Sequence, residues 1–279
     1  MQKIIAAFDG FKLSKSTLNY AIALTAKANA HLTNVFLDDK TYTRYAIYDL
    51  VFENGVSEKK MSKLQHKDAA VRSEATDVVI DACSKTGISF NLHHDENIAL
   101  DELLHETIFA DLLIINSAES FTHHEEKYPS RFLQDLLSNT QTPILLTPPT
   151  YQPIEKIVLL FDGTPTSVYA IKQLNYLLPI FNYLPVELIT VKNEDDQLSN
   201  VDIDLLKEFL QRHYPAITYT ILNGTASTEI VTYLKKEPLQ CLIALGAYRR
   251  SMMSRWFKSS MADALVHAFN FPLFIAHNK

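Results

Sequence analysis

The sequence predicts an α/β protein built from two tandem domains, each with an open sheet of five parallel strands flanked by helices. The first observation is an internal repeat: KIIAAFDG at residues 3–10 returns as KIVLLFDG at residues 156–163, with five of eight positions identical. The second is that residues 112–146 and 242–276 share one order: an apolar strand, a polar loop, a helix, and a strand beside a proline. A repeat at this spacing indicates a duplicated structural unit.

The segment TPPTYQP at residues 147–153 predicts a linker between the two units, because its three prolines stiffen the chain and interrupt regular structure. We therefore expect a first domain at residues 1–149 and a second at residues 154–279. With 47% apolar residues, each domain can bury a full core.

In the first half, short apolar runs alternate with longer amphipathic segments, the pattern of parallel strands joined by crossover helices. Ser14 or Ser16 can cap the first helix. We expect strands at 4–8, 32–37, 88–92 and 111–116 and one ending at 146, with later helices at 57–85, at 99–109 and beyond residue 130.

The second half repeats this alternation. Thr164 followed by Pro165 predicts a helix start, because a capping hydroxyl precedes a ring already fixed at helical φ. We expect strands at 157–161, 186–191, 217–222 and 242–245 and one after Pro272, with later helices at 201–213, at 229–235 and from the serines at 259 and 260.

The first half also carries an insertion of about 23 residues near residues 38–60, because the span from Asp9 to Asn116 is longer than its counterpart in the second half. Tyr42, Tyr45, Tyr48 and Phe52 recur at helical spacing and form an aromatic stripe. The stripe is expected to pack as a lid on its own domain. The alternative is a partner or ligand surface that works while both pockets are inert.

Composition limits the partners. The formal net charge of -6 and a pI near 5.9 argue against a nucleic-acid binder, which would present a broad basic face. Cys83 and Cys241 lie in different halves and are expected to be buried thiols. No apolar run reaches the roughly 20 residues that a spanning helix needs, and no signal peptide is evident. We expect a cytoplasmic protein without membrane partners.

Paired histidines and glutamates raise the question of a metal. Adjacent histidines in a strand point to opposite faces, and neither pair has the i, i+4 spacing of helical ligands. We therefore expect solvated side chains and no metal site at His93, His94, His123, His124, Glu125 and Glu126.

In a doubly wound sheet, ligands bind outside the carboxyl ends of the strands, where the strand order reverses. In the second half this rule brings together Asp162, Val191 and Gly246. The first-half counterparts are expected to be Asp9, Val35 and Asn116.

A strand ending in Asp-Gly, a fourth strand ending in Gly and a helix starting with Ser, in tandem, resemble the universal stress protein family. The resemblance covers the chain apart from the insertion and implies Rossmann-like domains. In nucleotide-binding members the loop after the fourth strand follows G-x2-G-x9-G-[S/T]. The resemblance implies that Asp162 and Val191 contact adenosine, and that Gly246 and Ser260 match the first glycine and the hydroxyl of the phosphate loop. Leu245, directly before Gly246, is also a candidate residue of this pocket.

The chain departs from that motif in both halves. Arg249 and Ser259 replace the second and third glycines of the second half. In the first half no glycine remains and only the hydroxyl of Ser130 matches, since the three glycine positions hold Asn116, Glu119 and Pro129. Side chains at these places prevent close backbone approach to phosphates. The first half is therefore expected to be a vestigial pocket without triphosphate.

The second half keeps a candidate anion site. Four cations, Arg249, Arg250, Arg255 and Lys258, lie within ten residues before the last helix. Guanidinium groups can bind phosphate in place of backbone amides. The alternative is a solvated charged surface without nucleotide. No cofactor is assigned; AMP, ADP and ATP are the candidate ligands, in the second half only.

The sequence therefore favours a tandem universal stress protein that acts as a non-catalytic binding or signalling module. Its expected partner is an unidentified protein or a small anionic ligand. The two halves would pair as an internal pseudo-dimer through their last strands, with a further homodimer left open. The alternative is a hydrolase or transferase on the same fold, for which Asp162, His213 and Ser259 are poor catalytic candidates.

Overall fold

We describe the fold from a computed structural model, which covers residues 2–37, 58–95, 98–122, 126, 128–192, 200–246 and 260–276. Most of the insertion, with its aromatic stripe, therefore lies outside the described residues, as does the basic loop at 247–259.

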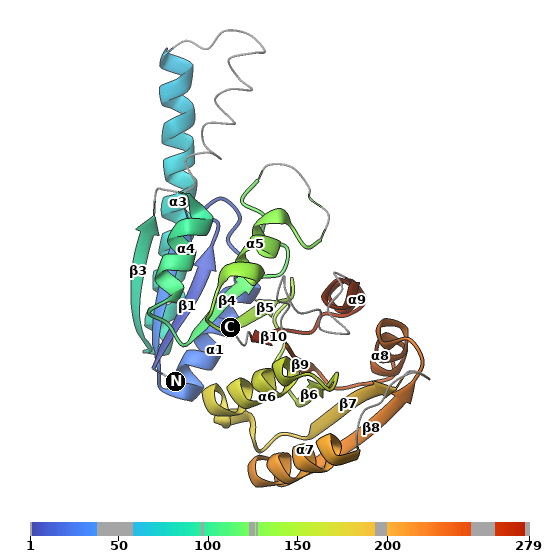
Figure 1. The fold of residues 1–279 in the computed structure, drawn as a ribbon. Helices are drawn as coiled ribbons and strands as arrows, with labels where there is room; N and C mark the ends of the chain where they lie inside the picture. The colour runs from blue at the N-terminus through green and yellow to red at the C-terminus, as the bar shows by residue number, and fades with distance from the viewer. Residues whose placement is uncertain are drawn as a thin grey trace.

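The first half alternates strands and helices as its periodicity predicts (Figure 1). The Oγ atom of Ser14 accepts a hydrogen bond from the amide of Thr17 at 3.2 Å, so the first of the two candidate serines is the helix cap. The elements are β1 (Lys3–Phe8), α1 (Lys15–Ala28), β2 (His31–Leu37), α3 (Glu58–Thr86), β3 (Ser89–Asp95), α4 (Ala99–Thr107), β4 (Leu112–Asn116), α5 (Arg131–Asn139) and β5 (Ile144–Thr147).

The second half repeats this order. Thr164 caps a helix whose first residue is Pro165, which confirms the predicted start. The elements are β6 (Lys156–Leu160), α6 (Pro165–Leu177), the short 3-10 helix η1 (Pro179–Phe181), β7 (Val186–Lys192), α7 (Asn200–His213), β8 (Ile217–Asn223), α8 (Ala226–Leu234), β9 (Cys241–Gly246), α9 (Ser260–Ala268) and β10 (Leu273–Ala276).

The ten strands of the described residues form one sheet in the order β3-β2-β1-β4-β5-β10-β9-β6-β7-β8. Neighbouring strands within each half are parallel, which confirms the predicted fold class. β5 and β10 pair antiparallel, with Leu145 opposite Phe274. The two halves therefore form an internal pseudo-dimer in which neither last strand is left as an open edge.

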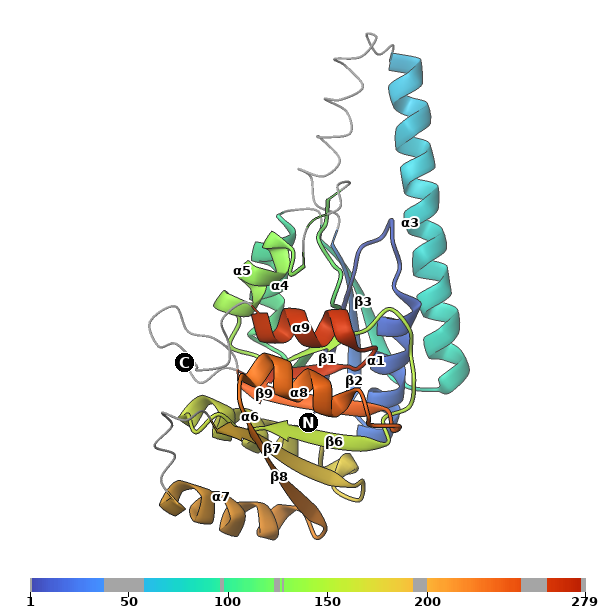
Figure 2. The ribbon, with the colours of Figure 1, turned by 90° about the vertical axis from the view of Figure 1, so that its right-hand side faces the viewer.

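The core lies on both faces of this sheet, because side chains alternate across each strand. Ile4 and Phe8 of β1 belong to a cluster covered by α1, α3, α6 and α7. Ile5 and Ala7 belong to a second cluster, covered by α4, α5, α8 and α9. Figure 2 shows α8 and α9 side by side over the sheet. Burial on both faces explains why the strands are almost continuously apolar.

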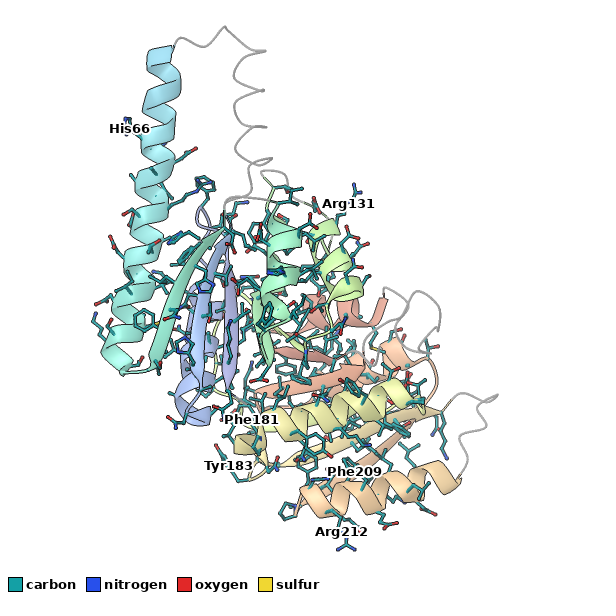
Figure 3. The ribbon with its side chains drawn as sticks, turned by 60° about the vertical axis from the view of Figure 1, so that its left-hand side comes forward. His66, Arg131, Phe181, Tyr183, Phe209 and Arg212 are labelled. Atoms are coloured by element: carbon teal, nitrogen blue, oxygen red, sulfur yellow. The ribbon has the colours of Figure 1, made fainter. Side chains whose placement is uncertain are left out.

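Helix α3 is the longest helix of the described chain. Its second half packs through the buried Ala75, Val79 and Cys83, whereas its first half, which includes His66, extends past the sheet (Figures 1 and 3). Both cysteines are free and buried. Within the described residues, none of the helices combines the length and apolar character needed to cross a membrane.

Candidate functional site

The strand order reverses between β6 and β9 in the second half, and between β1 and β4 in the first. A crevice forms at the carboxyl ends of parallel strands where the order reverses. Asp162 follows β6, Val191 lies near the end of β7 and Gly246 ends β9. These three residues therefore lie at one edge of the sheet, on adjacent strands.

Asp162 is held by the turn that follows it. Its Oδ1 atom accepts hydrogen bonds from the amide of Thr164 at 3.0 Å and from the hydroxyl of Thr164 at 2.6 Å. Gly163 between them has a φ of 81°, a left-handed conformation that glycine adopts without strain. Because Thr164 also caps α6, the buried carboxylate is fixed relative to the start of that helix.

Gly246 lets the end of β9 approach the first turn of α6. A Cβ atom on Gly246 would lie 2.7 Å from the carbonyl carbon and oxygen of Thr166, and 2.8 Å from the amide nitrogen of Ser167. These are backbone atoms that cannot rotate away, so this approach requires glycine. The side chains of Leu245 and Val191 are buried and belong to the core beneath this edge.

The phosphate-loop positions are only partly described. Arg249 and Ser259 lie outside the described residues, together with the other cations of the basic loop. Ser260 begins α9, as predicted from the sequence. The first turn of α9 therefore follows that loop directly, and the amides of a first helical turn favour anions.

The first half differs where β4 ends. Asn116 stands at the place of Gly246, and its Nδ2 atom donates a hydrogen bond at 2.8 Å to the Oγ atom of Ser14, the cap of α1. Its Oδ1 atom accepts a hydrogen bond from the amide of Ala118 at 2.7 Å. A side chain therefore bridges the strand end and the helix start, which in the second half meet backbone to backbone.

The loop after β4 folds inward. Glu119 is 6% exposed and Asp9 is 2% exposed, and both lie at this edge of the sheet. Burial, followed by the negative charge of Asp9, raises the pKa of Glu119 to about 7. The hydroxyl of Ser130 donates a hydrogen bond to the carbonyl oxygen of Glu119 and accepts one from the amide of Leu133 at 3.2 Å. The predicted serine thus caps α5 and holds the loop.

The β2 position of the first-half pocket differs from the prediction. Val35 pairs with Ala7 and is fully buried. Leu37, the last residue of β2, corresponds to Val191 by strand register. The difference of two residues arises because the sequences of the two halves are dissimilar in β2, so their alignment by sequence alone is ambiguous there.

A separate cavity of about 570 Å³ lies at the opposite edge of the sheet, between the ends of α4 and α5 and the side of α6. Thr107, Thr142 and Gln173 are among its lining residues. None of the pocket residues predicted from the sequence lines this cavity.

No protein-family model matches the chain. The chain is 21% identical over 286 residues to the universal stress protein Slr1230 of Synechocystis sp., a match that covers 98% of this chain and 99% of that protein. A solved universal stress protein from Archaeoglobus fulgidus shares the fold with a TM-score of 0.70, at 11% identity, over 99% of this chain and 98% of that one. The chain is therefore similar to universal stress proteins over nearly its whole length, in sequence to the first of these proteins and in fold to the second. A functionally unknown protein from Pseudomonas aeruginosa PAO1 has the same fold, with a TM-score of 0.57 at 13% identity over 99% of this chain and 92% of that one.

The paired histidines that the structure describes contact neighbouring side chains. The Nδ1 atom of His93 lies 2.7 Å from Oε1 of Glu106. The ring of His94 stacks on Phe36, with 5.0 Å between centroids. His123, His124 and Glu125 lie outside the described residues. Within the described ranges, no group of three or more His, Cys, Asp or Glu side chains is arranged to hold a metal.

Two kinds of residue at these sites were not predicted from the sequence pattern. Thr166 and Ser167 meet Gly246 through backbone atoms, so their residue types carry no signal. Phe121 is buried and packs edge-on against Phe132, with 4.6 Å between ring centroids. A large apolar residue inside a polar loop indicates a buried side chain, so the sequence did contain a signal for Phe121.

Proposed function

We propose that this chain is a universal stress protein that acts as a non-catalytic binding or signalling module of the stress response, and that its second half holds a small anionic ligand. AMP, ADP or ATP is the proposed ligand class. The observation that carries the proposal is the contrast between the halves at one place. Gly246 allows the backbone of β9 to lie against α6, while Asn116 and Glu119 fill the same region of the first half.

The chemistry of the second half supports an anion. Asp162 is held at the carboxyl end of β6, where its carboxylate can accept hydrogen bonds from ribose hydroxyls. The loop before α9 carries four cations in its sequence, and Arg249 and Ser259 replace glycines in it. A loop of this composition would bind phosphate through guanidinium groups and the start of α9, with fewer backbone amides than a glycine-rich loop.

The positions of the catalytic candidates that the structure describes support binding of a ligand without turnover. His213 ends α7, where its Nδ1 atom lies 2.9 Å from Nδ2 of Asn175. This position is at the start of β8, away from the carboxyl ends of the strands. Asp162 is engaged by the cap of α6. A base or nucleophile needs to reach the ligand, so the enzyme alternative has less support.

A titration tests the site. We expect AMP, ADP or ATP to raise the unfolding temperature of the full chain, because a ligand at 100 times its Kd stabilises the native state by about 2.7 kcal/mol. Asp162→Ala should abolish this shift, whereas Asp9→Ala, the same change in the first half, should leave it intact. The proposal fails if millimolar nucleotide gives no shift, or if only Asp9→Ala abolishes it.

The non-catalytic part has its own test. We expect ATP to be recovered intact after prolonged incubation with the protein, measured by chromatography of the released nucleotide. Turnover that disappears in Asp162→Ala would favour the hydrolase alternative. A cytoplasmic location belongs to the same proposal, and the two free, buried cysteines support it.

A further inference from the structure

The loop at residues 116–122 closes the carboxyl edge of the first half and is tied at both ends. At its start, the amide of Ser117 donates a hydrogen bond to the carbonyl oxygen of Thr147 at 2.9 Å. At its end, the Nζ atom of Lys12 donates one to the carbonyl oxygen of Thr122 at 3.1 Å. The loop therefore bridges β5 and the connection between β1 and α1.

Phe121 anchors the middle of this loop in the core. Its side chain is 7% exposed and belongs to the cluster beneath α4 and α5. Its φ of 49° is in the left-handed region, which is a strained backbone conformation for a residue other than glycine. Burial of the ring offsets this backbone strain, so a loop released from the core would lose the contact that maintains its conformation.

The same loop buries Glu119 beside Asp9. Asp9 and Lys12, from the connection after β1, are the charged groups that act on this carboxyl. From α5, Ser130 contributes its hydroxyl, whereas the side chain of Arg131 is 91% exposed and points into solvent (Figure 3). The carboxyl groups of Asp9 and Glu119 are thus buried at one site, and the nearby cation, Lys12, is exposed. Two negative charges at such a site are unfavourable.

We propose that the loop at residues 116–122 is a proton-controlled plug, which closes over the first half when Glu119 carries a proton and loosens when Glu119 is ionised. The first half would then respond to the proton that the carboxyl group of Glu119 binds. The inference stands on contacts within the first half and does not depend on nucleotide binding in the second.

The sign follows from linkage. The closed loop raises the pKa of Glu119 from its ordinary 4.5 to about 7, so the closed state binds more protons than the open state. Closing is therefore most favourable at low pH and weakens as the pH rises through this range. The equilibrium constant for closing should fall by about 300-fold from a pH well below both pKa values to a pH well above both. Between pH 5 and pH 8 it should fall by about 70-fold.

Hydrogen exchange of the full chain without nucleotide tests the plug. We expect the amide protection of residues 116–122, after correction for the intrinsic exchange rate, to fall by tens of fold from pH 5 to pH 8. Glu119→Gln keeps the shape and the hydrogen-bond acceptor but cannot ionise, so its loop should stay protected at pH 8. Glu74→Gln, an exposed change on α3, should behave as the wild type does.

Three results would overturn the plug. The first is protection that does not change with pH in the wild type. The second is a loss of protection in Glu119→Gln equal to that of the wild type. Asp9→Asn provides the third, because removal of its charge should lower the pKa of Glu119 and reduce the pH-dependent loss; an unchanged loss would contradict the pairing of the two carboxyls.

Discussion

Replacing Lys156 with methionine tests the buried charge network at the start of β6. The Nζ atom of Lys156 lies 2.7 Å from Oε2 of Glu187 and 2.6 Å from Oε2 of Glu237. The side chain of Glu187 is only 3% exposed, and its Oε1 atom also accepts hydrogen bonds from the hydroxyls of Tyr233, at 2.6 Å, and Thr220. Lys156→Met would remove the cation and leave this carboxylate buried.

The expected loss is large because a buried charge without its counterion is poorly solvated. We expect Lys156→Met to lower the free energy of unfolding by about 3–5 kcal/mol at pH 7. Burial alone would raise the pKa of Glu187, but hydrogen bonds from Lys156 and the two hydroxyls outweigh it and lower that pKa. The network therefore stabilises the fold above the ordinary pKa of a glutamate and less as the pH falls. In Lys156→Met, Glu187 can take up a proton, so the deficit should shrink toward pH 5.

Urea unfolding followed by circular dichroism measures this loss. The matched control is Lys207→Met on the surface of α7. The side chain of Lys207 is 42% exposed, and its Nζ atom lies 3.8 Å from Oδ1 of Asp204. Such an exposed pair contributes about 0–1 kcal/mol. Adding Glu187→Gln to Lys156→Met should recover part of the stability. The reasoning is refuted if Lys156→Met and Lys207→Met reduce the stability equally.

Three further substitutions test the carboxyl edge of the sheet. Gly246→Ala should lower the free energy of unfolding by about 1–3 kcal/mol, because its Cβ would overlap backbone atoms of Thr166. Asn116→Ala, at the equivalent place in the first half, should lower the free energy of unfolding by only about 1 kcal/mol, because only side-chain hydrogen bonds are lost. An alanine tolerated equally at both positions in a thermal melt would contradict the close approach. Phe121→Ala should lower the stability by about 3–5 kcal/mol, because the ring is buried against Phe132. A melting temperature within error of the wild type would show that the loop is not anchored by this ring.

Much of the fold could be predicted from local patterns. The Asp-Gly repeat revealed the duplication, and the Thr164-Pro165 pair predicted the start of α6. These signals work because strand burial, helix periodicity and capping depend on residues within a few positions of one another. The candidate site was predicted only in part. Asp162 and Gly246 lie at the carboxyl ends of the neighbouring strands β6 and β9, but the register of β2 placed Leu37 where Val35 was expected.

What the sequence determined by itself was therefore the order and type of the elements, and the end of the strands in each half at which the candidate site residues lie. What only the tertiary structure decided was how distant segments meet. Gly246 lies against Thr166, β5 pairs with β10, and Glu119 is buried near Asp9. Each of these contacts depends on packing between segments far apart in the chain, and burial and electrostatic environment take their values only once that packing is complete.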